Sequence, residues 1–152
     1  MDWYVKAFLK ASLAWLALGV SVGVAMAAHP LWTVYRLVHV HMLLLGFVTM
    51  MIYGVAYHVV PRFTGFPLHN RRAAVWHWWI SNTGLVLMAA GFAVRVHEAS
   101  AGTFVLATGG TLSALGAYTF VYLIWRTIDG PASMRAAQQR AQEAKAKKLN
   151  VA

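Results

Sequence analysis

The chain has 152 residues, of which 60% are hydrophobic and 11% are charged. Soluble domains carry about a quarter charged residues, so this balance indicates a protein that lies in lipid. The absence of cysteine excludes disulfides, iron–sulfur clusters, thiolate zinc sites and c-type haem attachment. A net charge of +9 also occurs in nucleic-acid-binding proteins. Here the basic residues flank apolar segments, so we expect no nucleic-acid partner.

Four apolar segments are long enough to cross a bilayer as helices, which takes about 20 residues. They are predicted at 4–28, 37–60, 73–94 and 102–125. Proline and glycine fall in the connections, at His29-Pro30, at 61–67 and at 98–102, and Asp129-Gly130-Pro131 ends the fourth segment. The sequence therefore predicts an all-α integral membrane domain of four helices over residues 1–130, followed by a basic tail over 131–152.

The first segment also resembles a secretory signal peptide. Lys6 and Lys10 precede the apolar run, and Ala25-Met26-Ala27 resembles a cleavage site. The run from Ala11 to Ala28 is longer than the usual apolar core of a signal peptide. We therefore expect a retained helix.

The basic residues predict how the chain lies in the membrane. If the N-terminus is inside, most Lys and Arg residues lie on that side, namely Lys6, Lys10, Arg62, Arg71, Arg72, Arg126, Arg135, Arg140, Lys145, Lys147 and Lys148. Arg36 and Arg95 lie outside. An excess of Lys and Arg marks the cytoplasmic side, which predicts a multi-pass protein of the cell's inner membrane with both termini in the cytoplasm. The tail is expected to be a solvated helix that contacts anionic lipid headgroups.

Two histidines stand near the start of the second segment, in the run Arg36-Leu37-Val38-His39-Val40-His41. Imidazoles inside a membrane helix are costly unless they have a function, although they can also simply bond to neighbouring helices or water. Residues i and i+2 of an α-helix point about 200° apart, so His39 and His41 cannot both bind one iron. Each can serve a metal centre on its own flank. His97, in an outer connection, is a weaker candidate for a metal ligand.

Three stretches together resemble the end of a known membrane protein. The run from Val38 to Gly46, with Gly54 and the turn from His58 to Gly65, is similar to the tenth helix of subunit I in haem–copper oxidases and nitric oxide reductases. That helix carries a His-x-His pair and ends in a His-x-x-Pro-x-Phe-Ser-Gly turn. Trp76 to Gly84 looks like the eleventh helix, and Thr111 to Trp125 looks like the twelfth. The first segment is matched only by its position.

The resemblance implies roles for these residues. In that family the first histidine of the pair binds the active-site haem and the second binds the low-spin haem on the other flank, which correspond here to His39 and His41. Arg95 matches arginines that hold haem propionates, and Arg36 is a second candidate on the same side. The cofactor implied is haem, which we expect to be of the b type, and the absence of cysteine excludes the c type. Copper is not expected, since the family's copper site needs an adjacent His-His pair that this sequence lacks.

The family's twelve helices form three similar arcs of four helices around a pseudo-threefold axis. In this chain the ligand-bearing helix is the second of four, so a homotrimer would rebuild the twelve-helix ring. His39 of one chain and His41 of its neighbour would then be the axial ligands of a haem at each protomer interface. Besides its own copies, the expected partners are membrane lipid and a quinol or another redox partner.

Three functions are compatible with these features. The first hypothesis is a low-spin b-type cytochrome with two axial histidines that transfers electrons. An iron with two histidine ligands has no open position for a gas, which favours an electron carrier over a catalytic enzyme. The alternatives are a minimal nitric oxide or oxygen reductase, and a haem- or gas-sensing protein or accessory subunit of a larger oxidase, which the basic tail suggests.

Overall fold

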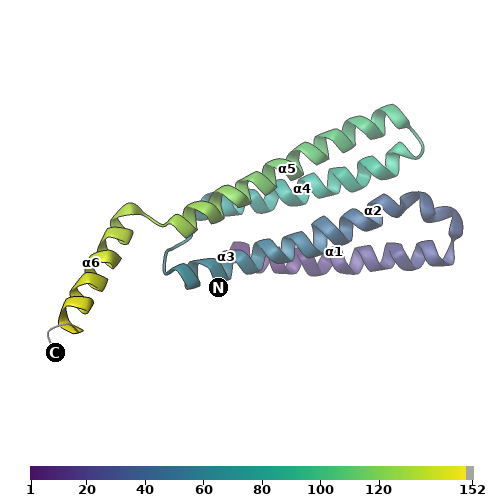
Figure 1. The fold of residues 1–152 in the computed structure, drawn as a ribbon. Coiled ribbons are helices and arrows are strands. Elements are labelled where there is room, and N and C mark those ends of the chain that lie inside the picture. Colours follow the sequence, from purple (N-terminus) through teal and green to yellow (C-terminus); the bar gives the residue numbers. More distant parts are fainter. Residues whose placement is uncertain (150–152) are drawn as a thin grey trace.

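A computed structural model describes residues 1–149, and this part of the chain is all α-helical. Four long helical segments run antiparallel as two pairs, and a shorter helix leaves from the end where the chain begins (Figure 1). The first segment is α1 (Trp3–Ala28). The second is continuous and comprises the 3-10 helix η1 (Pro30–Tyr35), α2 (Arg36–His41), the π-helix η2 (Met42–Thr49) and α3 (Met50–Thr64). The other pair is α4 (Arg71–Arg95) and α5 (Ala99–Asp129), and α6 (Ala132–Leu149) follows.

The predicted all-α membrane fold is confirmed. Within the described residues, three helical stretches are long and apolar enough to cross a membrane: Trp3–Ala28, Pro30–Thr64 and Ala99–Ala144. The third predicted segment, α4, has 25 residues but is less apolar, because the run from Trp76 to Thr83 includes histidine, serine, asparagine and threonine. It lies antiparallel to α5 along its length (Figure 1), so it completes a unit of four helices.

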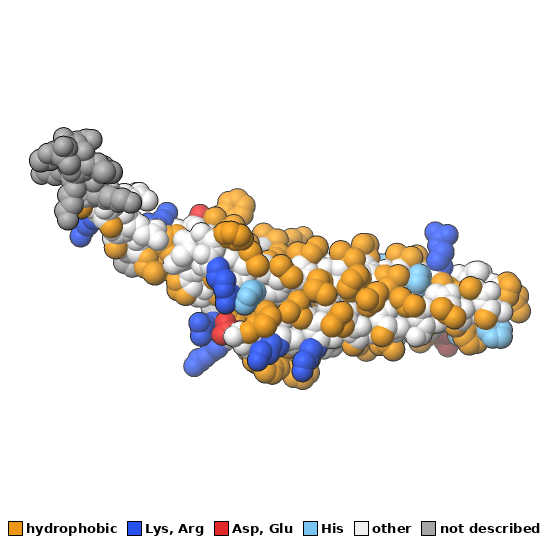
Figure 2. Space-filling view, turned by 90° about the horizontal axis from the view of Figure 1, so that it is seen from below, with side chains coloured by type: hydrophobic (Ala, Val, Ile, Leu, Met, Phe, Trp, Pro, Cys, Tyr) orange, Lys and Arg blue, Asp and Glu red, His pale blue; other side chains and the backbone are white. Residues whose placement is uncertain are grey.

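The outer surface of this unit is suited to lipid. Figure 2 shows apolar side chains along the whole length of the helical body. Phe104, Leu13 and Val24 are examples of large side chains that are more than half exposed. Four exposed tryptophans lie near the end that holds the N-terminus, at Trp3, Trp76, Trp79 and Trp125. Tryptophan is enriched where helices meet the lipid headgroups, so these residues indicate one edge of the bilayer.

The second helical segment extends beyond its predicted end at Val60. Helix α3 continues through Pro61 to Thr64, and Gly65 follows with φ of 72°. The Gly65 N–H donates to the Pro61 carbonyl at 3.1 Å, which closes the helix with a left-handed cap that glycine adopts without steric cost. Pro61 lies in the last turn, where its missing N–H removes one bond and does not break the helix.

Helices α4 and α5 approach closely through glycines spaced seven residues apart. These are Gly84 and Gly91 in α4, and Gly102, Gly109 and Gly116 in α5. A Cβ on Gly91 would lie 2.5 Å from the backbone nitrogen of Leu106, and one on Gly109 would clash with the backbone nitrogen of Met88. Small residues let membrane helices pack backbone to backbone, and a seven-residue period keeps them on one face.

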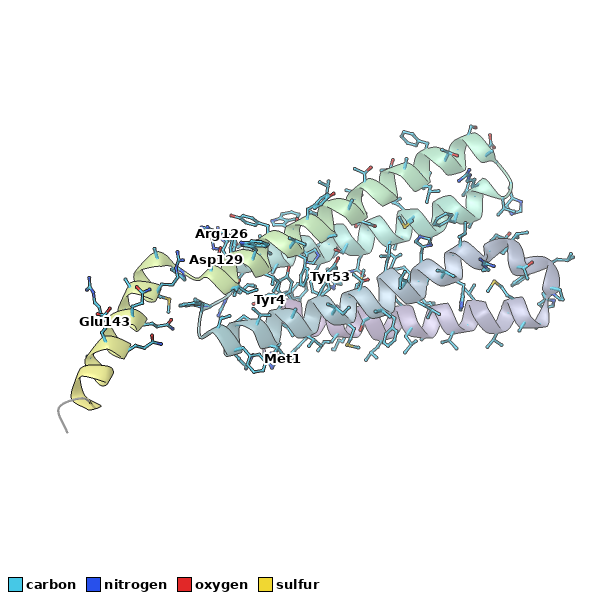
Figure 3. All side chains as sticks on the ribbon, viewed as in Figure 1. Met1, Tyr4, Tyr53, Arg126, Asp129 and Glu143 are labelled. Carbon is cyan, nitrogen blue, oxygen red and sulfur yellow. The ribbon has the colours of Figure 1, made fainter. Side chains whose placement is uncertain are left out.

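The buried core lies in the half of the unit near the N-terminus. Its members are Tyr4, Val5, Phe8, Trp15, Met50, Tyr53, Tyr57, Leu68, Ala74, Leu85 and Leu123. Figure 3 shows Tyr4 and Tyr53 between the two helix pairs. Trp15 Nε1 donates to Asn82 Oδ1 at 3.1 Å and so links α1 to α4. The opposite half, where α2 begins, is packed more loosely, with no buried residue in η1 and only Val38 buried in α2.

The predicted tail over 131–152 forms α6 as far as it is described. This helix leaves the four-helix unit at the end that holds the N-terminus (Figure 1). The last residues of the tail, 150–152, lie outside the described residues.

Candidate haem site

The histidine pair lies in α2, at the end of the unit away from both α6 and the N-terminus. Pro30 occupies the first position of η1, where its missing N–H costs nothing, and no further proline or glycine interrupts the chain before Gly46. The helix therefore runs uninterrupted through the pair. Val38 is buried and fixes the rotation of α2, which leaves His39 and His41 partly exposed on its two flanks.

His39 faces α1. Its Nδ1 lies 2.8 Å from the carbonyl oxygen of Gly19, and because a carbonyl only accepts, Nδ1 carries the proton. A Cβ on Gly23 would lie 2.8 Å from Cε1 of the His39 ring. The GxxxG pair formed by Gly19 and Gly23 thus makes room for the imidazole as well as for the close approach of the helices.

His41 faces the opposite side, toward α4. Its Nδ1 lies 2.8 Å from the carbonyl oxygen of Leu37, one turn earlier in the same helix. The ring centroid lies 4.6 Å from that of Phe92 in α4, with the ring planes inclined at 40°. The two imidazoles therefore point in opposite directions, as their spacing predicts.

The remaining ring nitrogen is accessible in both residues. Neither Nε2 forms a hydrogen bond with the described residues, and neither is among the buried atoms that lack a partner. With the proton held at Nδ1 by a backbone carbonyl, Nε2 presents its lone pair to a ligand. Metal-binding histidines have this arrangement, in which a second-shell acceptor fixes the tautomer. This geometry leaves each ring one nitrogen that could hold a metal centre on its own flank of α2.

The amino-acid sequence is similar to parts of known proteins, although no protein-family model matches the chain. Cytochrome c oxidase subunit 1 of Rhodobacter capsulatus is 28% identical over 122 residues, which cover 64% of this chain and 23% of the relative. Cbb3-type cytochrome c oxidase subunit CcoN1 of Stutzerimonas stutzeri is 27% identical over an alignment of 164 residues, which covers 87% of this chain and 35% of the relative. The chain is therefore distantly similar to part of these two oxidase subunits. It spans about a quarter to a third of the length of these relatives.

The other predicted site residues lie at the same end as the histidine pair. Arg36 begins α2 and Arg95 ends α4, three residues after Phe92, and both are exposed. Neither forms an ion pair with the described residues, where Asp2 is paired instead with Arg71 at the opposite end. The positions of Arg36 and Arg95 are therefore compatible with binding acidic groups of a ligand held by the histidines.

His97 takes a different partner. Its Nε2 lies 3.0 Å from the hydroxyl of Tyr35, which ties the connection after α4 to the end of η1. Within residues 1–149, no three His, Asp or Glu side chains gather in a way that could hold a metal ion. His97 therefore does not join His39 and His41 around one ion.

Sequence patterns did not indicate the π-helix η2, which directly follows the histidine pair. Its residues, Met42–Thr49, are strongly apolar and give the same pattern as an ordinary helix. The Thr49 hydroxyl donates to the carbonyl of Leu44, five residues earlier, at 2.8 Å. Gly46 lies within η2, and a Cβ there would lie 2.6 Å from Cβ of Trp15 in α1. Wide turns of this kind occur often at functional sites.

Proposed function

We propose that this chain is a haem-binding membrane protein, a low-spin b-type cytochrome with two histidine ligands that transfers electrons. The observation that carries the proposal is the state of the pair: His39 and His41 each hold Nδ1 on a backbone carbonyl and leave Nε2 accessible. This is the form in which imidazole binds iron. The distant relationship to proteins named as cytochrome oxidase subunits supports the same cofactor.

Haem would bring reversible one-electron chemistry to this site. His39 and His41 would hold the iron, and Arg36 and Arg95 would neutralise the propionates by charge-assisted hydrogen bonds. The lipid-facing helices would keep water away and so favour electron transfer over side reactions. Two histidine ligands would leave no position on the iron open for oxygen or nitric oxide.

The opposite directions of the two rings make a homotrimer part of the proposal. In one chain His39 faces α1 and His41 faces α4, so the two cannot meet at one iron. Two copies can supply one ligand each. Three copies of a four-helix unit close into a ring with one haem at each interface. The loosely packed outer ends of η1 and α2 would then be covered by the neighbouring copy.

The first experiment measures cofactor and stoichiometry together. The full chain is purified in mild detergent, its pyridine haemochrome spectrum is recorded, and its mass is determined with and without haem. We expect b-type haem, a trimer and one haem per chain. A folded, colourless preparation that does not bind added haemin would disprove the cytochrome, and a haem-loaded monomer would disprove the shared site.

The second experiment tests the shared ligands by complementation. His39→Ala and His41→Ala chains are each expected to lose the two-histidine spectrum. When the two variants are co-expressed with different tags, an interface is intact only where one variant supplies His39 and the other supplies His41. Random mixing should therefore restore about a quarter of the wild-type haem. A site built within one chain would restore none. His58→Ala, some 25 Å away along the helix, is the control and should keep its haem.

Carbon monoxide distinguishes this function from a minimal gas reductase. A low-spin iron with two histidines should show no spectral shift when reduced protein is exposed to the gas. A clear shift would indicate an open position on the iron and would favour reductase chemistry.

The proposal places the protein in the inner membrane with both termini in the cytoplasm. Figure 2 shows Lys and Arg side chains gathered near the end from which α6 leaves. Arg36 and Arg95 begin α2 and end α4 at the other end. An excess of Lys and Arg at one end is the feature that orients membrane proteins, with that end in the cytoplasm.

A further inference from the structure

A third histidine is buried far from the haem site. His77 in α4 has no exposed surface and is enclosed by aromatic rings of the three other long segments. Its ring centroid lies 4.9 Å from that of Phe8 in α1, 4.6 Å from that of Tyr53 in α3 and 6.1 Å from that of Phe120 in α5. Its Nδ1 lies 2.8 Å from the Tyr57 hydroxyl, but its Nε2 has no hydrogen-bond partner among the described residues. A buried polar atom without a partner is costly.

Two further buried hydroxyls without partners lie beyond His77. They belong to Ser81, one turn further along α4, and Ser113 on α5. A Cβ on Gly116 would lie 2.6 Å from the Ser81 Oγ and 3.6 Å from Cδ2 of His77, so this glycine keeps space open beside both. Three unpaired polar atoms in one stretch of a membrane bundle indicate a polar ligand.

A small cavity adjoins these groups. It has a volume of about 20 Å³, and its polar lining comes from Thr49, Tyr53, Ser81 and Ser113. A buried water needs about 10–15 Å³ and two to four polar partners. The cavity therefore fits one water molecule between the two serine hydroxyls. His77 does not line it but precedes Ser81 by one helical turn, and its Nε2 is the third unpaired atom of this stretch.

Tyr57 connects His77 to the end of the unit that holds the N-terminus. Besides its bond to Nδ1, Tyr57 lines a pocket of about 240 Å³ that is also lined by Asp2, Tyr4 and Arg71. The Tyr4 hydroxyl donates to Asp2 at 2.8 Å within this pocket. Tyr57 is only 2% exposed and borders both the open polar pocket and the buried imidazole, so it is the residue that can connect the two for proton transfer.

We propose that His77, Ser81 and Ser113 bind a water molecule inside the bundle, and that His77 exchanges a proton with the inner-end pocket through Tyr57. Before uptake the neutral His77 ring carries its proton on Nε2. In the uptake step the Tyr57 hydroxyl gives its proton to Nδ1 and takes one from water in the pocket, which leaves hydroxide there. The imidazolium then donates a hydrogen bond from Nε2–H to the bound water. The proton leaves by the same path, because the tightly packed His77 ring does not flip. The titratable groups that face His77 are Tyr53 and Tyr57 of α3, while α1 and α5 present Phe8 and Phe120.

The test reads His77 directly by nitrogen-15 NMR of histidine-labelled protein in lipid nanodiscs, with the signal assigned through His77→Gln. We expect a cross-peak between the His77 Nε2 proton and water. Tyr57→Phe keeps the aromatic ring and should slow proton exchange at His77 by about 10-fold or more. Ser113→Ala removes one hydroxyl from the cavity and should remove the water cross-peak.

Tyr118→Phe is the matched control, because Tyr118 is 72% exposed on α5 and should leave both signals unchanged. The proposal fails if wild-type His77 shows no contact with water, or if exchange at His77 is as fast in Tyr57→Phe as in the wild type. The readout does not require haem. A folded, colourless preparation that does not bind added haemin would therefore disprove the proposed cytochrome and leave this test unaffected.

Discussion

His39, His41 and His77 differ in the surroundings of one ring atom, Nε2, and those surroundings indicate what each residue can do. In His39 and His41 it reaches the surface with its lone pair free, while in His77 it is buried inside the bundle without a partner among the described residues. An accessible lone pair can bind a metal centre from outside the chain. A buried Nε2 can be satisfied only by something as small as water. The same residue type therefore supports two unrelated proposals.

Gly23 offers a direct test of the ligand geometry. In Gly23→Ala the new Cβ would stand 2.8 Å from Cε1 of His39, so the ring must shift away from its carbonyl anchor. Loss of a second-shell partner typically weakens metal binding 10- to 100-fold, and we expect haem affinity to fall by about 10-fold or more. Haemin titration monitored at the Soret band measures this. Ala17→Val, on the exposed face of the same helix, should bind as the wild type does. Equal affinity in the two variants would contradict the assignment of His39.

The opposite directions of His39 and His41 could be predicted because they follow from helix geometry within three residues. Their anchors could be predicted only in part. Leu37 lies one turn before His41, whereas the Gly19 carbonyl is twenty residues from His39 and becomes its neighbour only when α1 packs against α2. The position of His77, near the start of the third apolar segment, excludes it from the haem site at the other end of the unit. That position does not reveal its bond to Tyr57, which joins two different helices.

At the scale of the elements, the contact between α4 and α5 depends on glycines that have no room for a side chain. Gly109 and Gly110 are adjacent in α5, yet only Gly109 faces the backbone of Met88, while a Cβ on Gly110 would lie 3.5 Å from the flexible end of the Met88 side chain. Gly109→Ala should therefore lower the free energy of unfolding by about 1–3 kcal/mol, the usual cost of overpacking. Gly110→Ala should leave it nearly unchanged. Unfolding by SDS in mixed micelles compares the two, and equal stabilities would mean that α4 and α5 pack by another face.

The existence and order of the long helices could be predicted from apolar length and from the prolines and glycines between them. Two features of the elements could not. The end of α3 depends on the bond between Gly65 and the carbonyl of Pro61, although proline usually signals that a helix has already ended. The residues of the π-helix after His41 are almost all apolar, so side-chain periodicity cannot distinguish it from an α-helix.

At the scale of the whole molecule, the two ends of the unit are built differently. The end that holds the N-terminus carries the aromatic core, the Arg71–Asp2 ion pair and α6. The opposite end carries the histidine pair and two arginines without ion pairs in the described residues, on helices with few buried side chains. A well-packed end and an incompletely packed end are what a chain would need if its ligand site is completed by a neighbouring copy. The trimer proposal therefore draws on the packing of the chain as well as on the directions of its imidazoles.

The orientation of the molecule in the membrane gives the last prediction, and the chain suits the test because it has no cysteine of its own. Single cysteines are placed at Ala101, near the start of α5, and at Ala137 in α6, two exposed positions at opposite ends of the molecule. Intact spheroplasts are treated with a maleimide that does not cross membranes. Because the end rich in Lys and Arg should face the cytoplasm, Ala101→Cys should be labelled in intact cells and Ala137→Cys only after lysis. The reverse pattern would show the opposite orientation in the membrane, with the histidine pair near the cytoplasm and the Tyr57 pocket outside it. Labelling of both positions in intact cells would show that α5 does not cross the membrane, and the four-helix membrane unit would have to be abandoned.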